Sequence, residues 1–215
     1  MHLLISVPMK EDKFSTVAFL YSISYMPPIS YLMKCLDSDS IILEQHEHYV
    51  KQTYRNRCNI YGPNGKQTLV IPVVHDNIFR TPINKVRISN ETKWNNIHWK
   101  SVCAAYRNSP YFEFYEDDFR NLFENPEEFL FEFNLKLLKI IFDCFQVKAA
   151  IQLTENYQKI TENPSTDLRN YFHPKKIISS KKPYRQVFKE KHGFIDDLSC
   201  IDYLFNAGNK IDFTE

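Results

Sequence analysis

The chain has 215 residues, 43% of them hydrophobic and 25% charged, enough to build the core of one ordinary domain. Its 27 basic and 26 acidic residues leave a formal charge of +1, without the basic excess typical of nucleic-acid-binding proteins. Only four glycines are present, and neither GxGxxG nor GxxxxGK occurs, which excludes the standard phosphate-binding loops.

The five cysteines stand singly and form no CxxC pair, a pattern typical of free thiols in a reducing compartment. No apolar run approaches the roughly 20 residues that a membrane-spanning helix needs. We therefore expect a cytoplasmic protein without a membrane span. Met9 begins a sequence typical of protein starts, so we expect residues 9–215 to form a single domain and residues 1–8 to be a disordered or mis-assigned extension.

The first predicted elements form a strand–helix–strand unit. Ser15–Ser24 is a short apolar run with β-branched and aromatic members, which suits a buried strand. Pro27 and Pro28 end it because proline cannot donate to a strand ladder, and Pro28 is well placed to begin a helix over Ile29–Leu36. A second strand follows at Ile41–Leu43. This order predicts a βαβ unit, in which the loop after the first strand is a usual ligand-binding position.

A hairpin is predicted around Gly62–Gly65, because Gly-Pro-Asn-Gly is a strong turn signal between two strand-like runs, Arg57–Tyr61 and Thr68–Val74. The second run is apolar and suits a central strand, although Pro72 requires an edge or a bulge. A further short strand is predicted at Lys85–Ile88. Alternation along the first strand places Arg57, Asn59 and Tyr61 on one face of the strand, and it places Cys58 and Ile60 on the other face.

Two long helices are predicted in the second half of the chain. Lys93–Arg107 carries apolar residues around most of its circumference, so we expect it to be largely buried. Asn125 is predicted to cap the next helix, with its apolar stripe running to Phe145. In that helix Glu132 and Lys136 have the spacing of an ion pair.

The C-terminal third is expected to contain less regular structure. Ala149–Leu153 suits a strand, and Thr154–Pro183 is polar and turn-rich, typical of a long loop or lid. Asp196 or Asp197 is predicted to cap a closing helix that ends at Gly208. Together these elements predict an α/β fold: a single domain with a mixed β-sheet flanked by helices.

The stretch from Glu44 to Ile60 carries the densest set of chemically active side chains. Glu44, His46 and His48 alternate and could hold zinc or iron if the strand continued through them; otherwise they are a polar strand end. His46 with Glu47 or Glu44 would also make an acid–base pair. His98, on the predicted buried helix, is either a catalytic residue or a hydrogen-bonded core histidine.

Three cations in the same stretch, Lys51, Arg55 and Arg57, suggest an anion-binding clamp beside Tyr49, Tyr54 and Asn56. On a strand their odd positions would share one face. The alternative is surface pairing with the acidic residues at 116–118. We favour the clamp because arginine offers a bidentate fork to phosphate or carboxylate.

Several motifs together resemble the WbqC-like family. They are Tyr25-x-Pro27-x3-Tyr31, Tyr49-x-Lys51, Tyr54-Arg-Asn-Arg57, the apolar strand Leu69–Val73, WNNIHWKSVCAAYRNSPYFEFY, PYRQVF and FIDDLSCIDYLFNAG. The resemblance implies a cytoplasmic bacterial protein associated with O-antigen or other surface-polysaccharide biosynthesis. It marks as matched positions Tyr25, Pro27, Tyr31, Lys51, Asn56, Arg57, His98 and Tyr106. The chain departs from the family at residues 45–48, where relatives carry Asp-Asp-Val-Gln, so a family-wide metal site is not expected.

We accordingly expect a transferase that acts on an activated anionic small molecule such as a nucleotide-linked sugar. Tyr25, Tyr31, Asn56 and Tyr106 would shape the substrate site, the three cations would hold the anionic group, and His46 or His98 with Glu47 would move a proton. No cofactor is identified, and a divalent metal is the less favoured possibility. The alternative is a non-catalytic binding or assembly protein that contacts a basic partner enzyme through Tyr111, Phe112, Phe114, Tyr115 and Phe119.

Overall fold

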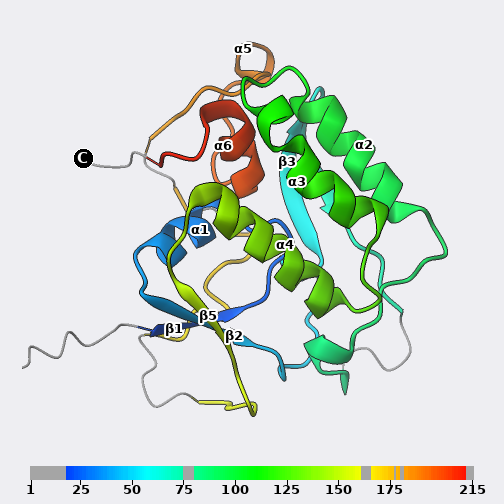
Figure 1. Cartoon of the computed structure of the whole chain (residues 1–215), viewed down its shortest axis with the longest axis vertical. Coiled ribbons are helices and arrows are strands. Elements are labelled where there is room, and N and C mark those ends of the chain that lie inside the picture. Colours follow the sequence, from blue (N-terminus) through cyan, green and yellow to red (C-terminus); the bar gives the residue numbers. More distant parts are fainter. Residues whose placement is uncertain (1–17, 75–79, 161–165, 177, 180–181, 212–215) are drawn as a thin grey trace, which may run out of the picture.

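A computed structural model of the chain describes residues 18–74, 80–160, 166–176, 178–179 and 182–211 (Figure 1). The predictions for residues 1–8 and for the first residues of the Ser15–Ser24 strand lie outside these ranges. Five strands and several helices belong to one α/β domain, as predicted from the sequence. Within the described part of the chain, none of the helices has the length and hydrophobicity needed to cross a membrane.

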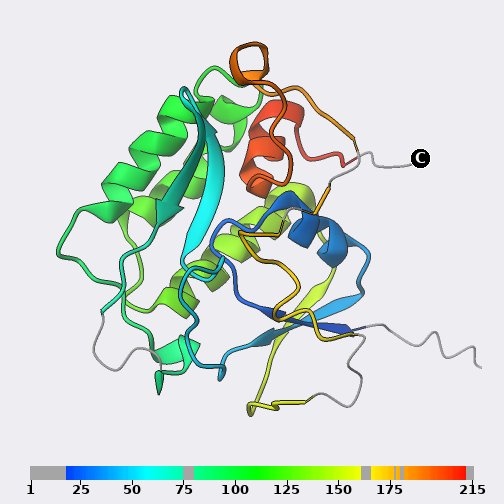
Figure 2. The same cartoon turned by 180° about the vertical axis from the view of Figure 1, so that it is seen from behind.

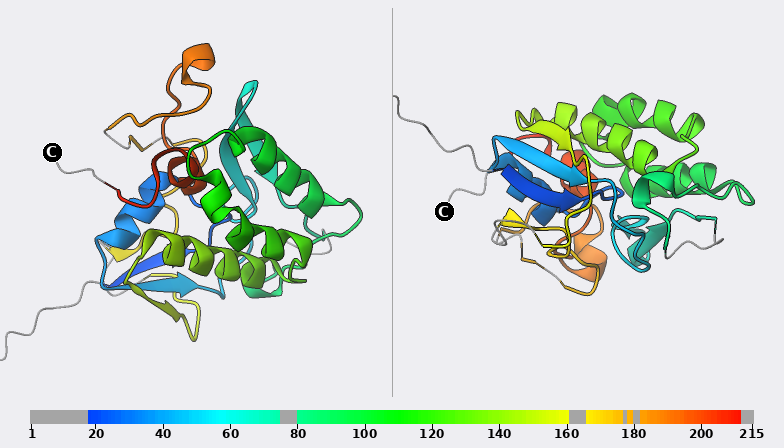
Figure 3. Two further views of the ribbon diagram at one scale, coloured as in Figure 1. Left: turned by 45° about the horizontal axis from the view of Figure 1, so that its top comes forward. Right: turned by 90° about the horizontal axis from the view of Figure 1, so that it is seen from below.

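The first half of the fold is a three-stranded parallel sheet in the order β1-β2-β5, made of Ala18–Ser22, Ser40–Glu44 and Ala150–Leu153. Leu20 pairs with Ile42, and Ile42 pairs in turn with Gln152. Helix α1, Ile29–Leu36, connects the first two strands and begins directly after Pro28. The predicted βαβ unit is therefore confirmed. In the right-hand view of Figure 3 the strands lie toward the viewer and the helices behind them.

The second sheet is an antiparallel hairpin of β3, Arg57–Gly62, and β4, Gly65–Val70. It is separate from the parallel sheet, so the parallel and antiparallel pairings do not form one mixed sheet. The predicted strand Thr68–Val74 is wrong in extent, because β4 ends at Val70, before Pro72. The predicted strand Lys85–Ile88 is also wrong: the short helix η2 occupies Ile83–Lys85, and Arg87 and Ile88 form only isolated bridges.

Helix α2, Trp94–Tyr106, packs on the hairpin. Helix α3, Phe112–Glu124, packs on α2, and helix α4, Leu130–Phe145, packs on α3. Helix α2 is less enclosed than predicted, since Ile97 is 56% exposed. Helix α3 was not predicted, although its buried residues recur at helical spacing: Phe112, Tyr115, Phe119, Leu122 and Phe123. Figure 2 shows the hairpin from behind the molecule, with α2 and α3 on its far side.

Two predicted helix details in this region are wrong. Asn125 does not cap α4; it follows the last residue of α3, and α4 begins at Leu130 after Phe129. Lys136 pairs with Glu127, which precedes the helix, and not with Glu132. A local spacing rule cannot anticipate either outcome, because both follow from where α3 ends against α4.

The chain closes with the short helix α5, Lys189–His192, and with α6, Cys200–Ala207. Ser199, not Asp196 or Asp197, is the residue before α6, and Gly208 follows it with φ +83°. Helix α6 lies at the centre of the core. The ring of Phe205 contacts Tyr106 at 5.3 Å, Phe112 at 5.2 Å and Phe119 at 5.7 Å between centroids.

Candidate functional site

The carboxyl ends of the parallel strands hold a buried group of charges, which we call the strand-end network: Ser22, Glu44, Glu47, Arg55, Asp167 and Arg169. Arg169 pairs with Asp167 at 2.6 Å and with Glu44 at 3.4 Å. The hydroxyl of Ser22 donates to the backbone carbonyl of Arg169 at 2.8 Å. Buried charges need such partners because their desolvation is costly. The network therefore holds the loops after β1, β2 and β5 together.

Arg55 belongs to this network, although the sequence suggested a substrate-binding role. Its Nε donates to Glu47 Oε1 at 2.8 Å, and its Nη2 donates to Glu47 Oε2 at 2.5 Å and to Ser22 Oγ at 2.6 Å. Arg55 is only 3% exposed and Glu47 only 7%. The pair closes the loop between β2 and β3, and both side chains are committed to each other.

The expectation that the odd positions of this stretch share a strand face is wrong. Residues 45–56 are irregular chain, bends and turns with an isolated bridge at His48, and β3 begins only at Arg57. Lys51 lies exposed on a turn next to Gln52, which has φ +58°. The three predicted cations therefore separate, with Arg55 inside the network and the other two outside it.

The histidines of the stretch are placed apart. Glu44 accepts hydrogen bonds from the His46 backbone at 2.8 Å and from the Thr154 hydroxyl at 2.9 Å. The His46 ring nitrogen Nε2 lies 3.1 Å from the Thr154 carbonyl, and His48 is exposed. Among the residues described, no group of three His, Cys, Asp or Glu side chains is arranged to hold a metal ion.

His98 is a buried histidine with its hydrogen bonds satisfied. Its Nδ1 lies 2.9 Å from the Tyr25 hydroxyl, and its ring meets the edge of Trp94. Burial lowers the pKa of His98 to about 4, against a smaller upward effect of a backbone hydrogen bond with Val70. The ring is therefore neutral at pH 7, as in the core-histidine alternative.

The remaining predicted shape-setting residues are also interior. Tyr31 donates its hydroxyl proton to the Ser22 carbonyl at 3.2 Å, and Asn56 donates from its side chain to the Ile71 carbonyl at 2.9 Å. The Tyr106 hydroxyl accepts the backbone N–H of Tyr61 at 3.1 Å. These contacts position loops and strands, and they leave little of each side chain open to a ligand.

The outward face of the β3–β4 hairpin is different. Alternation and register place on it Arg57, Asn59, Lys66 and Thr68, while Cys58 and Ile60 face the core, as predicted. Arg57 is half-buried, and its Nε is enclosed without a hydrogen-bond acceptor. Within the described residues Arg57 has no ion pair, and it lies close enough to Tyr49 to lower the pKa of that phenol against the larger upward effect of burial. An enclosed guanidinium nitrogen without an ion pair among the described residues is a candidate position for an anionic ligand.

The same hairpin face opens into a cavity of about 240 Å³, which we call the hairpin cavity. Its lining includes Tyr54, Asn59, Lys66, Phe194 and Asp197. The loop before α6 is held against β3 here, because the Ser199 backbone N–H donates to the Asn59 carbonyl at 2.8 Å. The cavity therefore combines a cation, a carboxyl group, a phenol and an amide over an aromatic wall.

Asp197 is the most unusual residue of the cavity. It has φ +51°, an uncommon left-handed conformation for a residue with a side chain. Burial raises the pKa of its carboxyl group to about 6, although hydrogen bonds from Ser30 and from the Ile178 backbone act in the opposite direction. A strained residue with a raised pKa beside a cavity is typical of a functional site.

Sequence reasoning missed three of these residues. Alternation had placed Asn59 on the face of Arg57 without a role in the site. The register across the Gly62–Gly65 turn could have added Lys66 to that face, since a two-residue loop fixes the pairing. Asp197 was interpreted as a helix cap. No local signal reveals its burial, which depends on the loop packing onto β3.

Comparison with known proteins gives one match. The model of the WbqC-like protein family matches residues 24–176, which include most of the loop after β1, the strand-end network except Ser22, and the hairpin. This confirms the resemblance inferred from the motifs. Neither the curated proteins nor the solved structures contain a significant match to the chain.

Proposed function

This chain belongs to the WbqC-like protein family, and on that premise we propose that it is a cytoplasmic transferase of bacterial surface-polysaccharide biosynthesis. Its substrate would be an activated anionic small molecule such as a nucleotide-linked sugar. The hairpin cavity and the adjoining Arg57 would form the substrate site.

The observation that carries this proposal is the enclosed Nε of Arg57, which has no acceptor within the described residues. A buried donor without a partner costs about 1–3 kcal/mol, so a protein keeps one where a ligand supplies the acceptor. A phosphate oxygen fits, because arginine binds phosphate through two parallel hydrogen bonds. Lys51, exposed on the preceding turn, would add a second positive charge at the outer end.

The reaction itself would take place in the hairpin cavity, next to Arg57 on the outward face of the hairpin. Arg57 and Asn59 are two residues apart on β3, about 7 Å, so a ligand held at Arg57 reaches the hairpin cavity. Lys66 would hold the leaving anionic group. Asp197, with a pKa of about 6, is mostly ionised at pH 7 and is a stronger base than an ordinary aspartate.

In the proposed step Asp197 takes the proton from an acceptor hydroxyl as that oxygen bonds to the transferred group. The bond between the transferred group and the leaving phosphate breaks, and its electron pair stays on the phosphate, beside Arg57 and Lys66. Asp197 would replace the proton carriers expected from the sequence, since Glu47 is paired with Arg55 and the Nδ1 of His98 is bonded to Tyr25.

The test is calorimetric titration with nucleotide-linked sugars, using Arg57→Ala and the control Arg107→Ala, an exposed arginine just after α2. We expect Arg57→Ala to weaken binding at least tenfold, in line with the loss of a charge-assisted hydrogen bond, and Arg107→Ala to change it less than twofold. Equal affinity for wild type and Arg57→Ala would contradict the anion site.

The catalytic part has its own test. Asp197→Asn should leave substrate affinity within about threefold and lower kcat by 10²-fold or more, the usual contribution of a general base. A variant with normal kcat would remove Asp197 from the mechanism while leaving the binding site intact.

The second candidate function is that of a non-catalytic assembly protein in the same pathway. One observation favours it: Phe114 is 77% exposed beside a large groove on α3 and α4. This alternative would be supported if no nucleotide-linked sugar binds to the protein while the groove beside Phe114 binds a basic partner.

A further inference from the structure

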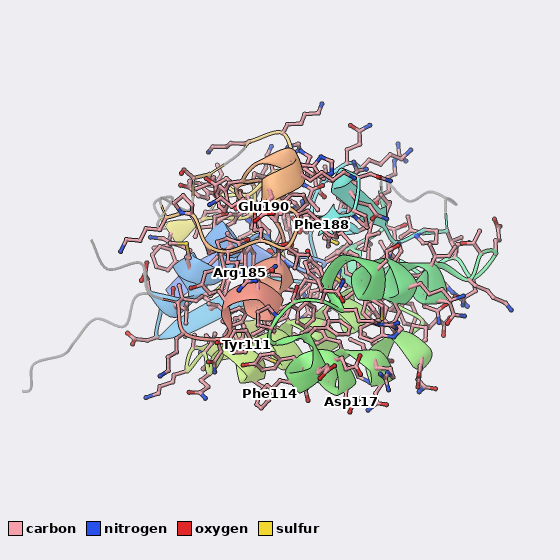
Figure 4. The ribbon with its side chains drawn as sticks, turned by 90° about the horizontal axis from the view of Figure 1, so that it is seen from above. Tyr111, Phe114, Asp117, Arg185, Phe188 and Glu190 are labelled. Atoms are coloured by element: carbon pink, nitrogen blue, oxygen red, sulfur yellow. The ribbon has the colours of Figure 1, made fainter. Side chains whose placement is uncertain are left out.

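A groove of about 560 Å³ lies between α3, α4 and the residue after Gly208. We call it the aromatic–acidic groove after the side chains that line it: Tyr111, Phe114, Tyr115, Asp118 and Asp143. It shares no residue with the hairpin cavity. Figure 4 shows Tyr111 and Phe114 on one side of α6, with Arg185 and Phe188 on the other.

The aromatic wall of the groove is unusually open. Phe114 is 77% exposed and Tyr111 42% exposed, and the Phe114 ring stands edge-on to Tyr115 at 4.7 Å. Phe112 and Phe119, which the sequence also suggested for a contact surface, are each 1% exposed and belong to the core. An exposed apolar surface with a polar rim is typical of an interaction site.

The charges of the groove are all negative. Asp118 and Asp143 form no ion pair with a lysine or arginine in the described part of the chain. The thiol of Cys144 is the neighbour of Asp118, 3.8 Å from Oδ2. Arg120, two residues after Asp118 in α3, pairs with Glu116 and Asp117 and so does not neutralise the groove.

Asp143 also lies at the helix end that disfavours a negative charge. It is in the last turn of α4, where the backbone carbonyls carry partial negative charge, and this turn contains no basic residue. An acidic side chain there is destabilising, and proteins break such local rules most often at functional sites. A cation in the groove would relieve both the helix end and the two carboxylates.

We propose that the aromatic–acidic groove binds an arginine side chain presented by a basic segment of a partner protein. A guanidinium group stacks on aromatic rings and donates paired hydrogen bonds to carboxylates, which matches a lining that contains Tyr111, Phe114, Asp118 and Asp143. The volume of the groove accommodates the whole side chain.

The test uses the peptide Gly-Arg-Gly, blocked at both ends, and the same peptide with neutral citrulline in place of arginine. We expect the arginine peptide to shift the backbone amide signals of α3 and the end of α4 in an NMR titration, and the citrulline peptide to leave them unchanged. Asp143→Asn should weaken the arginine peptide about threefold to fivefold, as for an exposed ion pair.

Glu132→Gln is the matched control, because it removes one negative charge from the first turn of the same helix. It should not change peptide affinity. Thermal unfolding separates the two variants further: Asp143→Asn should raise the melting temperature of the free protein, and Glu132→Gln should lower it slightly, since the helix dipole reverses between the two ends.

Equal shifts with both peptides, or shifts outside the groove, would overturn the proposal. Sedimentation analysis gives another decisive outcome: a dimer that Asp143→Asn dissociates would assign the groove to a second copy of the chain. Because the groove and the hairpin cavity are separate, failure here leaves the proposed transferase site untouched.

Discussion

The Tyr25 hydroxyl and the Nδ1 of His98 lie 2.9 Å apart in the core, with Tyr25 fully buried and His98 4% exposed. This contact joins the loop after β1 to helix α2. Because both groups are shielded from water, each depends on the other for its hydrogen bond.

The first prediction concerns this pair. His98→Phe should destabilise the protein by about 1–3 kcal/mol, because the Tyr25 hydroxyl loses its partner in a site that water does not reach. The double variant Tyr25→Phe/His98→Phe should cost less than the sum of the single changes, by about 1 kcal/mol. Urea unfolding of the four proteins measures this coupling. Loss of the proposed transferase activity in His98→Phe with unchanged stability would instead make His98 catalytic.

The second prediction concerns the ion pair of Arg55 and Glu47. Glu47→Gln removes one charge of a buried pair and leaves the Arg55 guanidinium uncompensated, so we expect a loss of about 3–5 kcal/mol. The double change Glu47→Gln/Arg55→Met removes both charges and should recover part of the lost stability. If the single variant is as stable as wild type, the pair does not hold the loop between β2 and β3.

The third prediction is a pH dependence that comes from Asp202, which is fully buried in α6 and accepts hydrogen bonds from Tyr184 and Gln186. Burial raises its pKa to about 6, whereas an unfolded aspartate titrates near 3.9. The native state therefore binds this proton more tightly. The stabilisation is complete below pH ~4 and is lost as the pH rises through 6, by roughly 3 kcal/mol.

Asp202→Asn removes this dependence. As the pH rises from 4 to 7, the free energy of unfolding of the variant relative to wild type should increase by roughly 2–3 kcal/mol. His98 acts in the opposite direction, since its lowered pKa stabilises the fold above pH ~6.5 and this is lost as the pH falls toward 4. Comparing variant with wild type at each pH cancels that effect. A difference independent of pH would show that folding does not raise the pKa of Asp202.

The fourth prediction uses two glycines. Gly208 has φ +83°, and a Cβ there would lie 3.2 Å from the Tyr111 ring; Gly65 has φ +98° and open space. Gly65→Ala should cost about 1 kcal/mol through backbone strain alone, and Gly208→Ala should cost more because the ring must also move. Thermal unfolding compares them. Equal losses of stability in the two variants would mean that the Tyr111 ring moves aside at no energetic cost.

The sequence by itself determined the elements whose signals are local. Helix α1 occupies the predicted residues Ile29–Leu36, because Pro28 sets its first turn and the apolar spacing suits a helix packed on one face. The hairpin was also predicted from its Gly62–Gly65 turn, although its second strand, Gly65–Val70, begins and ends earlier than expected. The motifs also indicated the family, which the match over residues 24–176 confirms.

Only the tertiary structure decided the environments of the charged and polar groups. Arg55 and Glu47 find each other because the chain turns back between β2 and β3, which no strand periodicity describes. Arg57 differs from Arg55 in burial and pairing, although the two are separated by a single residue. Asp197 and His98 owe their shifted pKa values to desolvation by elements distant in the sequence. Residue type sets which chemistry a side chain can perform, whereas packing sets its charge, its partners and its access to a ligand.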